Sequence, residues 1–159
     1  MTNREVAAIL FNISSILADQ DGNPYRIRAY RRAARNLLRM RQQVAERIAQ
    51  GRELGLPRLG KSLTAKITEL ATKNSLSFYD TLCAELPEDE QVIVKIPGFG
   101  PTIARRIHKD LGTVDAASLR RAVVNGKLQK VWGIGPKRTA AILDAVGVRE
   151  NVWQHRLQL

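Results

Sequence analysis

The sequence predicts an all-α protein made of two small helical lobes. Alanine, leucine and arginine dominate a chain of 159 residues that is 44% apolar and 5% aromatic. This composition favours helices and is sufficient for a core. Runs of β-branched residues, which would indicate strands, are nearly absent. A twelve-residue pattern of glycines and apolar residues also recurs three times along the chain, as expected of repeated helical hairpins.

The first lobe begins with two helices joined by a short turn. Thr2 and Glu5 have the spacing of a capping box, and apolar residues then recur at helical spacing. The turn residues Asp19–Pro24 precede a second helix, and Pro87 ends the lobe. The first three helices expected here span about residues 2–18, 25–40 and 44–50. The fourth is opened by the first copy of the repeated pattern and ends near residues 72–74. The fifth spans about residues 78–86.

The second lobe begins at the acidic stretch Pro87–Glu90, whose carboxylates suit the positive end of a helix dipole. Thr113 or Asp115 is expected to start another helix, which runs to about Asn125. A last short helix is expected at Arg149–Leu157. We therefore predict two domains, residues 1–86 and 87–159.

The repeated pattern occupies Leu56–Ile67, Ile96–Ile107 and Val131–Ile142, which align without gaps. Gly98 and Gly133 allow a tight turn through positive φ. The next glycine of each copy lacks a side chain, so a phosphate could approach the backbone at the start of a helix, where free N–H groups favour an anion. In the second and third copies the following proline suits the first helical position. The glycines of this second position are Gly60, Gly100 and Gly135.

This pattern resembles the helix-hairpin-helix motif, which binds DNA backbone phosphates without reading bases; a tight turn without a ligand is the alternative. Lys and Arg number 26 against 15 Asp and Glu, a net charge of +11, and residues 23–52 carry nine arginines and one acid. Such charge attracts polyanions, of which nucleic acid is the first partner to consider and an anionic membrane surface the second. The residues expected to contact DNA are Arg26, Arg28, Arg32, Arg35, Gly60, Lys61, Gly98, Gly100, Thr102, Arg105, Arg106, Gly133, Gly135, Lys137 and Arg138.

Other function classes find little support in the sequence. Cys83 is the only cysteine and the chain has two histidines, so neither a disulfide framework nor a metal cluster is expected. No apolar run approaches the roughly 20 residues of a membrane span. The N-terminus lacks the features of a signal peptide. We therefore expect a cytoplasmic protein without a membrane partner, associated with the nucleoid if its source is bacterial.

Nearly the whole chain resembles the N-terminal region of family X DNA polymerases. The resemblance rests on NREVAAILFNISSIL, GNPYRIRAYRRAARNL and the three copies of the pattern. It implies a lyase-like domain followed by a helix-hairpin-helix region. The family's polymerase palm, a mixed sheet with metal-binding aspartates, has no counterpart here, since the only Asp-x-Asp lies in the Asp19–Pro24 turn. Polymerisation by this chain alone is therefore not expected.

The resemblance also implies a catalytic site. In the family, a lysine forms a Schiff base with 5′-deoxyribose phosphate, and β-elimination follows; Lys66 matches that lysine and Tyr30 a pocket tyrosine. Arg26 matches a phosphate-binding residue. Two alternatives stay open: Lys66 could be an ordinary surface lysine or a phosphate contact, and Tyr30 could be a core residue. The positions that depart from the family pattern are Tyr25, Leu54, Arg58, Ser62, Ala65 and Phe78.

The family's hairpins often hold a monovalent cation through backbone carbonyls. The resemblance therefore implies a possible Na⁺ or K⁺ site in the second hairpin, at Ile96 and Phe99, or in the third, at Val131 and Ile134. No other cofactor is expected.

Together these features predict a sequence-independent DNA-binding protein of DNA repair that prefers gapped or nicked DNA to intact duplex. A 5′-deoxyribose-phosphate or abasic-site lyase acting through Lys66 is the alternative, and an RNA-binding or protein-interaction module is a third. A partner protein with nuclease or polymerase activity is also expected.

Overall fold

A computed structural model describes residues 1–147 of the chain. These residues form α-helices and one short 3-10 helix, with no strand among them, which confirms the all-α prediction. The chain divides into two compact units, of which the first is Met1–Leu82 and the second begins at Cys83. This division falls four residues before the expected lobe boundary, inside a helix. The helix expected at Arg149–Leu157 lies outside the described residues.

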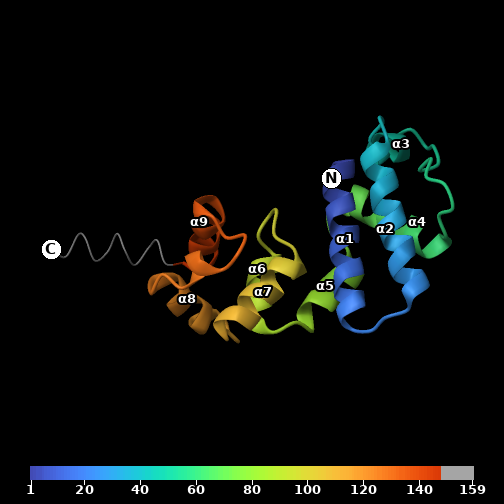
Figure 1. The fold of residues 1–159 in the computed structure, drawn as a ribbon. Helices are drawn as coiled ribbons and strands as arrows, with labels where there is room; N and C mark the ends of the chain where they lie inside the picture. Colours follow the sequence, from blue (N-terminus) through green and yellow to red (C-terminus); the bar gives the residue numbers. More distant parts are fainter. Residues whose placement is uncertain (148–159) are drawn as a thin grey trace. The chain divides into compact units, whose positions relative to one another are not determined.

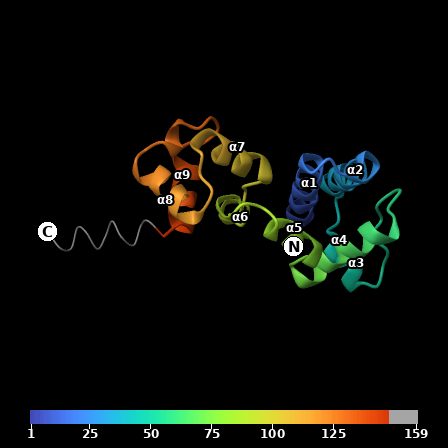
Figure 2. The ribbon, with the colours of Figure 1, turned by 90° about the horizontal axis from the view of Figure 1, so that it is seen from below.

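In the first unit, two long helices run antiparallel side by side, as Figures 1 and 2 show. The side chains of Val6, Leu10 and Ile13 on the first helix are fully buried, as is Leu37 on the second. Ile67 and Leu70 of a later helix complete this core. The helices of this unit are α1 (Asn3–Asp19), α2 (Pro24–Arg39), α3 (Val44–Ala49), α4 (Lys61–Lys73) and the first part of α5 (Ser77–Ala84).

Side-chain caps set the starts of α1 and α2. The Thr2 hydroxyl accepts from the Glu5 N–H at 3.2 Å, and the Glu5 carboxylate accepts from the Thr2 N–H at 2.8 Å, so the predicted capping box is present. The Asn23 side chain accepts from the Tyr25 N–H at 2.9 Å. These bonds satisfy N–H groups that a helix start leaves without partners.

The buried side chain of Asn3 connects α1 to the segment before α3. Its carbonyl oxygen accepts from the Val44 N–H at 2.8 Å, and its amide donates to the Gln42 carbonyl at 2.9 Å. α4 ends at Asn74, whose φ of 55° is left-handed. In the first unit, α4 therefore packs on a core built by α1 and α2. The first hairpin turn lies directly before α4.

The second unit packs four short helices and a 3-10 turn around a small apolar centre. Ile93, Ile107, Leu119, Leu128 and Ile142 are fully buried and come from all five elements. The elements of this unit are α6 (Glu88–Val94), α7 (Pro101–Leu111), α8 (Ala116–Val124), the 3-10 helix η1 (Leu128–Lys130) and α9 (Pro136–Ala145). Because each element is short, packing rather than propensity must supply most of their stability.

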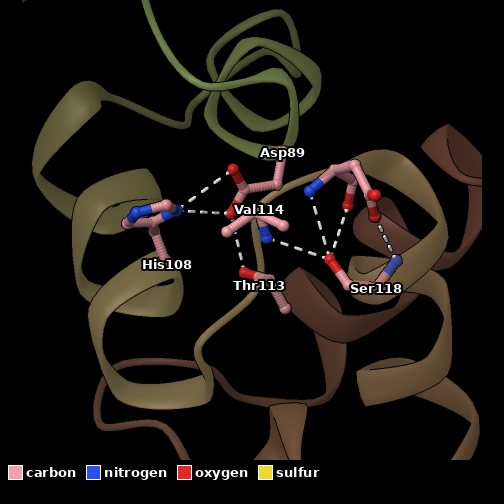
Figure 3. A network of polar contacts seen from close by, with 6 residues as sticks. Asp89, His108, Thr113, Val114 and Ser118 are labelled. Atoms are coloured by element: carbon pink, nitrogen blue, oxygen red, sulfur yellow. Dashed lines mark hydrogen bonds and ion pairs between the residues drawn. The ribbon is translucent and has the colours of Figure 1, made fainter.

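A buried carboxylate joins the two helices of the second hairpin (Figure 3). Asp89, in the first turn of α6, is fully buried and accepts from the Thr113 hydroxyl at 2.6 Å and from His108 Nδ1 at 3.0 Å. The next residue, Val114, donates its N–H to Ser118 at 2.9 Å, inside the capping box that starts α8. Asp89 therefore connects α6 to α7 through His108 and, through its buried bond to Thr113, to the segment that starts α8. The sequence indicated only its favourable place at a helix N-terminus.

Candidate nucleic-acid interface

The three copies of the pattern form three turns of the same handedness. φ is 54° at Arg58, 85° at Gly98 and 87° at Gly133. In the second and third turns, the Phe99 and Ile134 N–H groups donate to the carbonyls of Ile96 and Val131, both at 3.1 Å. Arg58 therefore keeps the left-handed backbone of the glycine turns, although an L side chain disfavours it.

The helices that precede these turns differ. α6 leads directly into the second turn, whereas α3 ends well before the first and η1 is a single 3-10 turn before the third. Only the second copy therefore has α-helices immediately on both sides of its turn. The helices that follow are regular in all three copies, and they begin directly after Gly60, Gly100 and Gly135.

We expect Arg58→Gly to stabilise the first unit by about 0.5–1 kcal/mol. The substitution removes a left-handed strain of about 1–2 kcal/mol, part of which the greater freedom of glycine in the unfolded chain offsets. Urea unfolding measures the change, with Arg58→Ala as the control because alanine keeps the strained φ. A glycine variant no more stable than the alanine variant would contradict a strained Arg58.

The helix after each turn starts without a side-chain cap. Gly60, Gly100 and Gly135 occupy the N-cap positions of α4, α7 and α9, and no side chain bonds to the helix start there. The N-cap side chains of α1, α2 and α8 do cap their helices, whereas those of α3 and α6, which are not glycine, do not. The hairpin helices therefore leave N–H groups, together with the positive end of the helix dipole, available to an anion.

Two of these cap glycines are not required by the fold. φ is −74° at Gly60 and −92° at Gly135, values that any residue adopts, and a Cβ at either would meet no atom within 4 Å. Gly133 is different, because its φ is positive and a Cβ there would lie 3.1 Å from Arg106 Nη1. A ligand that approaches the backbone at Gly60 and Gly135 would account for glycine at both positions.

Most of the basic side chains predicted to contact DNA are exposed. On α2 these are Arg26, Arg28, Arg32 and Arg35, and at the hairpin helices Lys61, Arg105 and Lys137 are exposed together with Thr102. Arg28, Arg32 and Arg35 lie on the face of α2 opposite its buried residues, whereas the Arg26 guanidinium lies 5.9 Å from the centre of the buried Tyr30 ring.

Arg106 and Arg138 instead hold the third turn together. Arg106 donates from Nη1 to the Trp132 carbonyl at 3.1 Å, and Arg138 donates from Nη1 to the Gly133 carbonyl at 2.8 Å. The Arg138 guanidinium also lies 5.9 Å from the centre of the Phe99 ring, in the second turn. These two arginines therefore bring the second and third turns of the same unit together, a role that the sequence did not indicate.

Carbonyls in the second and third turns are the predicted ligands of a monovalent cation. Ile96 and Val131 each accept one hydrogen bond at their carbonyl and keep a second lone pair. In the third turn, however, two guanidinium groups already bond to the neighbouring carbonyls, and their positive charge opposes a cation. The second turn, with Ile96 and Phe99, is thus the better candidate for Na⁺ or K⁺. Residues 1–147 hold no cluster of three His, Cys, Asp or Glu suited to a metal ion.

The residues predicted for lyase chemistry lie together around Phe78. Lys66 Nζ donates to the Ser62 hydroxyl at 2.6 Å and lies 4.8 Å from the centre of the Phe78 ring. The Arg26 guanidinium lies 5.0 Å from the same centre. The Tyr30 ring is stacked on Phe78 at 6.4 Å with an angle of 8° between the planes.

This environment changes the acid–base properties of two groups. Burial lowers the pKa of the Lys66 ammonium below its ordinary value, and the Arg26 guanidinium lowers it further, against an opposing effect of Glu69. Burial raises the pKa of the Tyr30 phenol, and Arg26 partly offsets this. Tyr30 is only 2% exposed, so it is a core residue that also forms one wall of the cluster.

The sequence drew attention to Phe78 only as a departure from the family pattern. The structure makes it the centre of the cluster, in contact with residues of α2 and α4. No periodicity within α5 could have indicated this, because the contacts join three helices that are far apart in the sequence.

Comparisons with known proteins agree with the resemblance seen in the sequence. Residues 1–76 match a family described as the helix-hairpin-helix domain. Over 147 residues the chain is 29% identical to the DNA polymerase/3′-5′ exonuclease PolX of Bacillus subtilis, and the match covers 92% of this chain. It covers 25% of that relative, so the chain spans about a quarter of its length. The similarity to a family X polymerase is therefore confirmed. No helix within residues 1–147 is long and apolar enough to span a membrane.

Proposed function

We propose that this chain, with its helix-hairpin-helix domain and its similarity to a family X polymerase, binds DNA through the backbone phosphates without reading the base sequence. The observation that carries the proposal is the start of the three hairpin helices. All three have glycine and no side-chain cap, and at Gly60 and Gly135 the fold itself does not call for glycine. An anion that contacts the backbone accounts for both features.

The anion that best suits these uncapped helix starts is a phosphate group of a polyanion. The chain carries a net charge of +11, and α2 exposes a row of arginines. Lys61 directly follows Gly60 and Lys137 lies two residues after Gly135, where each ammonium can neutralise a phosphate that the N–H groups hold. The uncapped helix starts offer backbone N–H groups, which can contact phosphates but carry no base-specific pattern, and this supports binding without sequence preference.

Gapped or nicked DNA is the proposed substrate, in the context of DNA repair. The relative's name describes a DNA polymerase and 3′-5′ exonuclease, and both activities act at a 3′ end in DNA. Each unit of this chain has at least one uncapped hairpin helix, so two units joined in one chain could hold phosphates on both sides of an interruption. A partner protein, or a further part of a longer chain, would then supply polymerase or nuclease activity.

The salt dependence of binding tests the proposal. With at least one phosphate for each of three hairpins, log K should fall with log salt at a slope of about −2.7 or steeper, from roughly 0.9 per phosphate. Fluorescence anisotropy with a labelled gapped duplex gives the slope, and competition with intact duplex and with duplex RNA of equal length gives the preference.

A nearly flat slope would favour a protein-interaction module. Equal competition by intact duplex would remove the gap preference, and stronger competition by RNA would make the chain an RNA-binding module.

A lyase reaction at Lys66 is the second candidate, because the lowered pKa of Lys66 increases its neutral, nucleophilic fraction. The Lys66 amine would add to the C1′ aldehyde of the ring-opened sugar, and loss of water would give the imine. Water would then accept a C2′ proton, the C–H electron pair would form a C2′–C3′ double bond, and the 3′ phosphate would leave with the electron pair of the C3′–O bond. Hydrolysis would restore the amine. The Arg26 side chain, whose guanidinium lies 5.0 Å from the centre of the Phe78 ring, would hold the 5′ phosphate.

A further inference from the structure

Trp132 is the large aromatic residue that the second unit exposes most among its described residues. Its side chain is 79% exposed at the tip of the third turn, directly before Gly133. The corresponding position of the repeated pattern is Pro57 in the first copy and Pro97 in the second. The turn therefore forms in the two other copies with proline at this position, so its geometry does not require the indole ring.

An isolated exposed aromatic residue is ordinary on a protein surface, but the Trp132 ring is held in place. Arg106 of α7 donates to the Trp132 carbonyl at 3.1 Å, and its guanidinium lies 4.8 Å from the centre of the indole. One side chain thus contacts both the backbone and the ring of Trp132. The contact covers the ring only in part, since most of the side chain stays in solvent.

The surroundings of the ring match the chemistry of a nucleotide. Gly135 and the uncapped start of α9 lie three and four residues further along the chain, followed by Lys137. A flat apolar ring beside a phosphate-binding helix start presents the two groups that a single-stranded nucleotide requires, a stacking surface for the base and a cationic site for the backbone. In intact duplex the bases are stacked on one another and are not available to such a ring.

We propose that Trp132 stacks on an unpaired base at a gap or a single-stranded end of DNA, next to the phosphate bound at the start of α9. Arg106 acts as a positioning residue that holds the indole in the stacking orientation. This inference rests on the proposed DNA binding and adds a reason for the preference for interrupted DNA, because only unpaired bases reach the ring.

The test compares Trp132→Ala and Trp132→Phe with the unmodified chain. The probes are a duplex with a five-nucleotide gap and an intact duplex of the same length. The alanine variant should bind the gapped duplex roughly tenfold more weakly and the intact duplex equally well, from the magnitude of base–aromatic stacking. The phenylalanine variant should retain most of the affinity. Val124→Ala is the matched control, since Val124 is also an exposed apolar residue of this unit.

Fluorescence supplies a second readout. Trp153→Phe leaves Trp132 as the only tryptophan of the chain, and its emission should be quenched by the gapped duplex and not by the intact duplex. Unchanged emission together with unchanged affinity of Trp132→Ala for the gapped duplex would overturn the stacking role while DNA binding stands. An equal loss for both duplexes would make Trp132 a support of the turn instead. If the unmodified chain binds neither duplex, the proposed function itself fails.

Discussion

A Gly60→Ser, Gly135→Ser double variant should keep its fold and lose DNA affinity by roughly two orders of magnitude. At each position the serine adopts the existing backbone without strain, and its hydroxyl can cap the N–H groups that face outward. The phosphate then loses charge-assisted hydrogen bonds worth about 1.5–3 kcal/mol each, and about 1.4 kcal/mol corresponds to a tenfold change in affinity. Anisotropy titration with the gapped duplex measures the loss.

Thermal unfolding of the same variant separates binding from folding. Because serine is a better N-cap than glycine by a few tenths of a kcal/mol, the melting temperature should stay equal or rise slightly. Pro87→Ser is the control, since it adds a serine cap to α6 at the end away from its hairpin turn. That variant should bind DNA as the unmodified chain does. Full DNA affinity in the double variant would show that phosphates do not contact these helix starts.

A Lys66→Arg variant should form no covalent adduct with DNA that carries a 5′-deoxyribose phosphate, while its DNA affinity stays nearly unchanged. Arginine keeps the positive charge beside Phe78, and its guanidinium stays protonated and cannot form the imine. Borohydride reduction traps the imine of the unmodified chain, and gel analysis detects the adduct. Lys61→Arg is the matched control, because Lys61 lies on the same helix and is exposed.

The pH dependence of trapping gives an independent check of the environment of Lys66. Its lowered pKa in the folded chain means that the neutral amine forms at lower pH than for an ordinary lysine. Adduct formation should therefore rise with pH and level off below the ordinary lysine pKa of about 10.4. Adduct of equal yield in the Lys66→Arg variant would assign the reaction to another amine, and no adduct in the unmodified chain would remove the lyase candidate.

The helices were largely predictable because their signals are local. The capping box of Thr2 and Glu5, the turn before Pro24 and the positive φ of Gly98 and Gly133 each depend on residues within a few positions of one another. The same holds for the hairpin turns, whose glycines and apolar residues recur in a fixed order. The left-handed φ of Arg58 could be anticipated only by alignment with the two glycine copies, since arginine itself favours other backbone conformations.

Contacts between helices could not be predicted in this way. The sequence placed Lys66, Tyr30 and Arg26 in one site only through a family resemblance, and it did not indicate that Phe78 would lie between them. It counted Arg106 among the phosphate contacts, and it did not indicate that the Arg106 guanidinium also contacts the Trp132 carbonyl and ring. Such roles depend on which helix faces cross, and a local pattern does not encode the crossing.

The sequence alone therefore determined the fold class, the three hairpin turns and the positive charge, because each follows from composition or from short-range backbone rules. Only the tertiary structure decided what each site residue contacts. Packing buried Asp89 beneath the second hairpin, joined the second and third turns through Arg106 and Arg138, and left Trp132 exposed at the tip. These outcomes depend on distances between side chains that are remote along the chain, which are set when the helices pack.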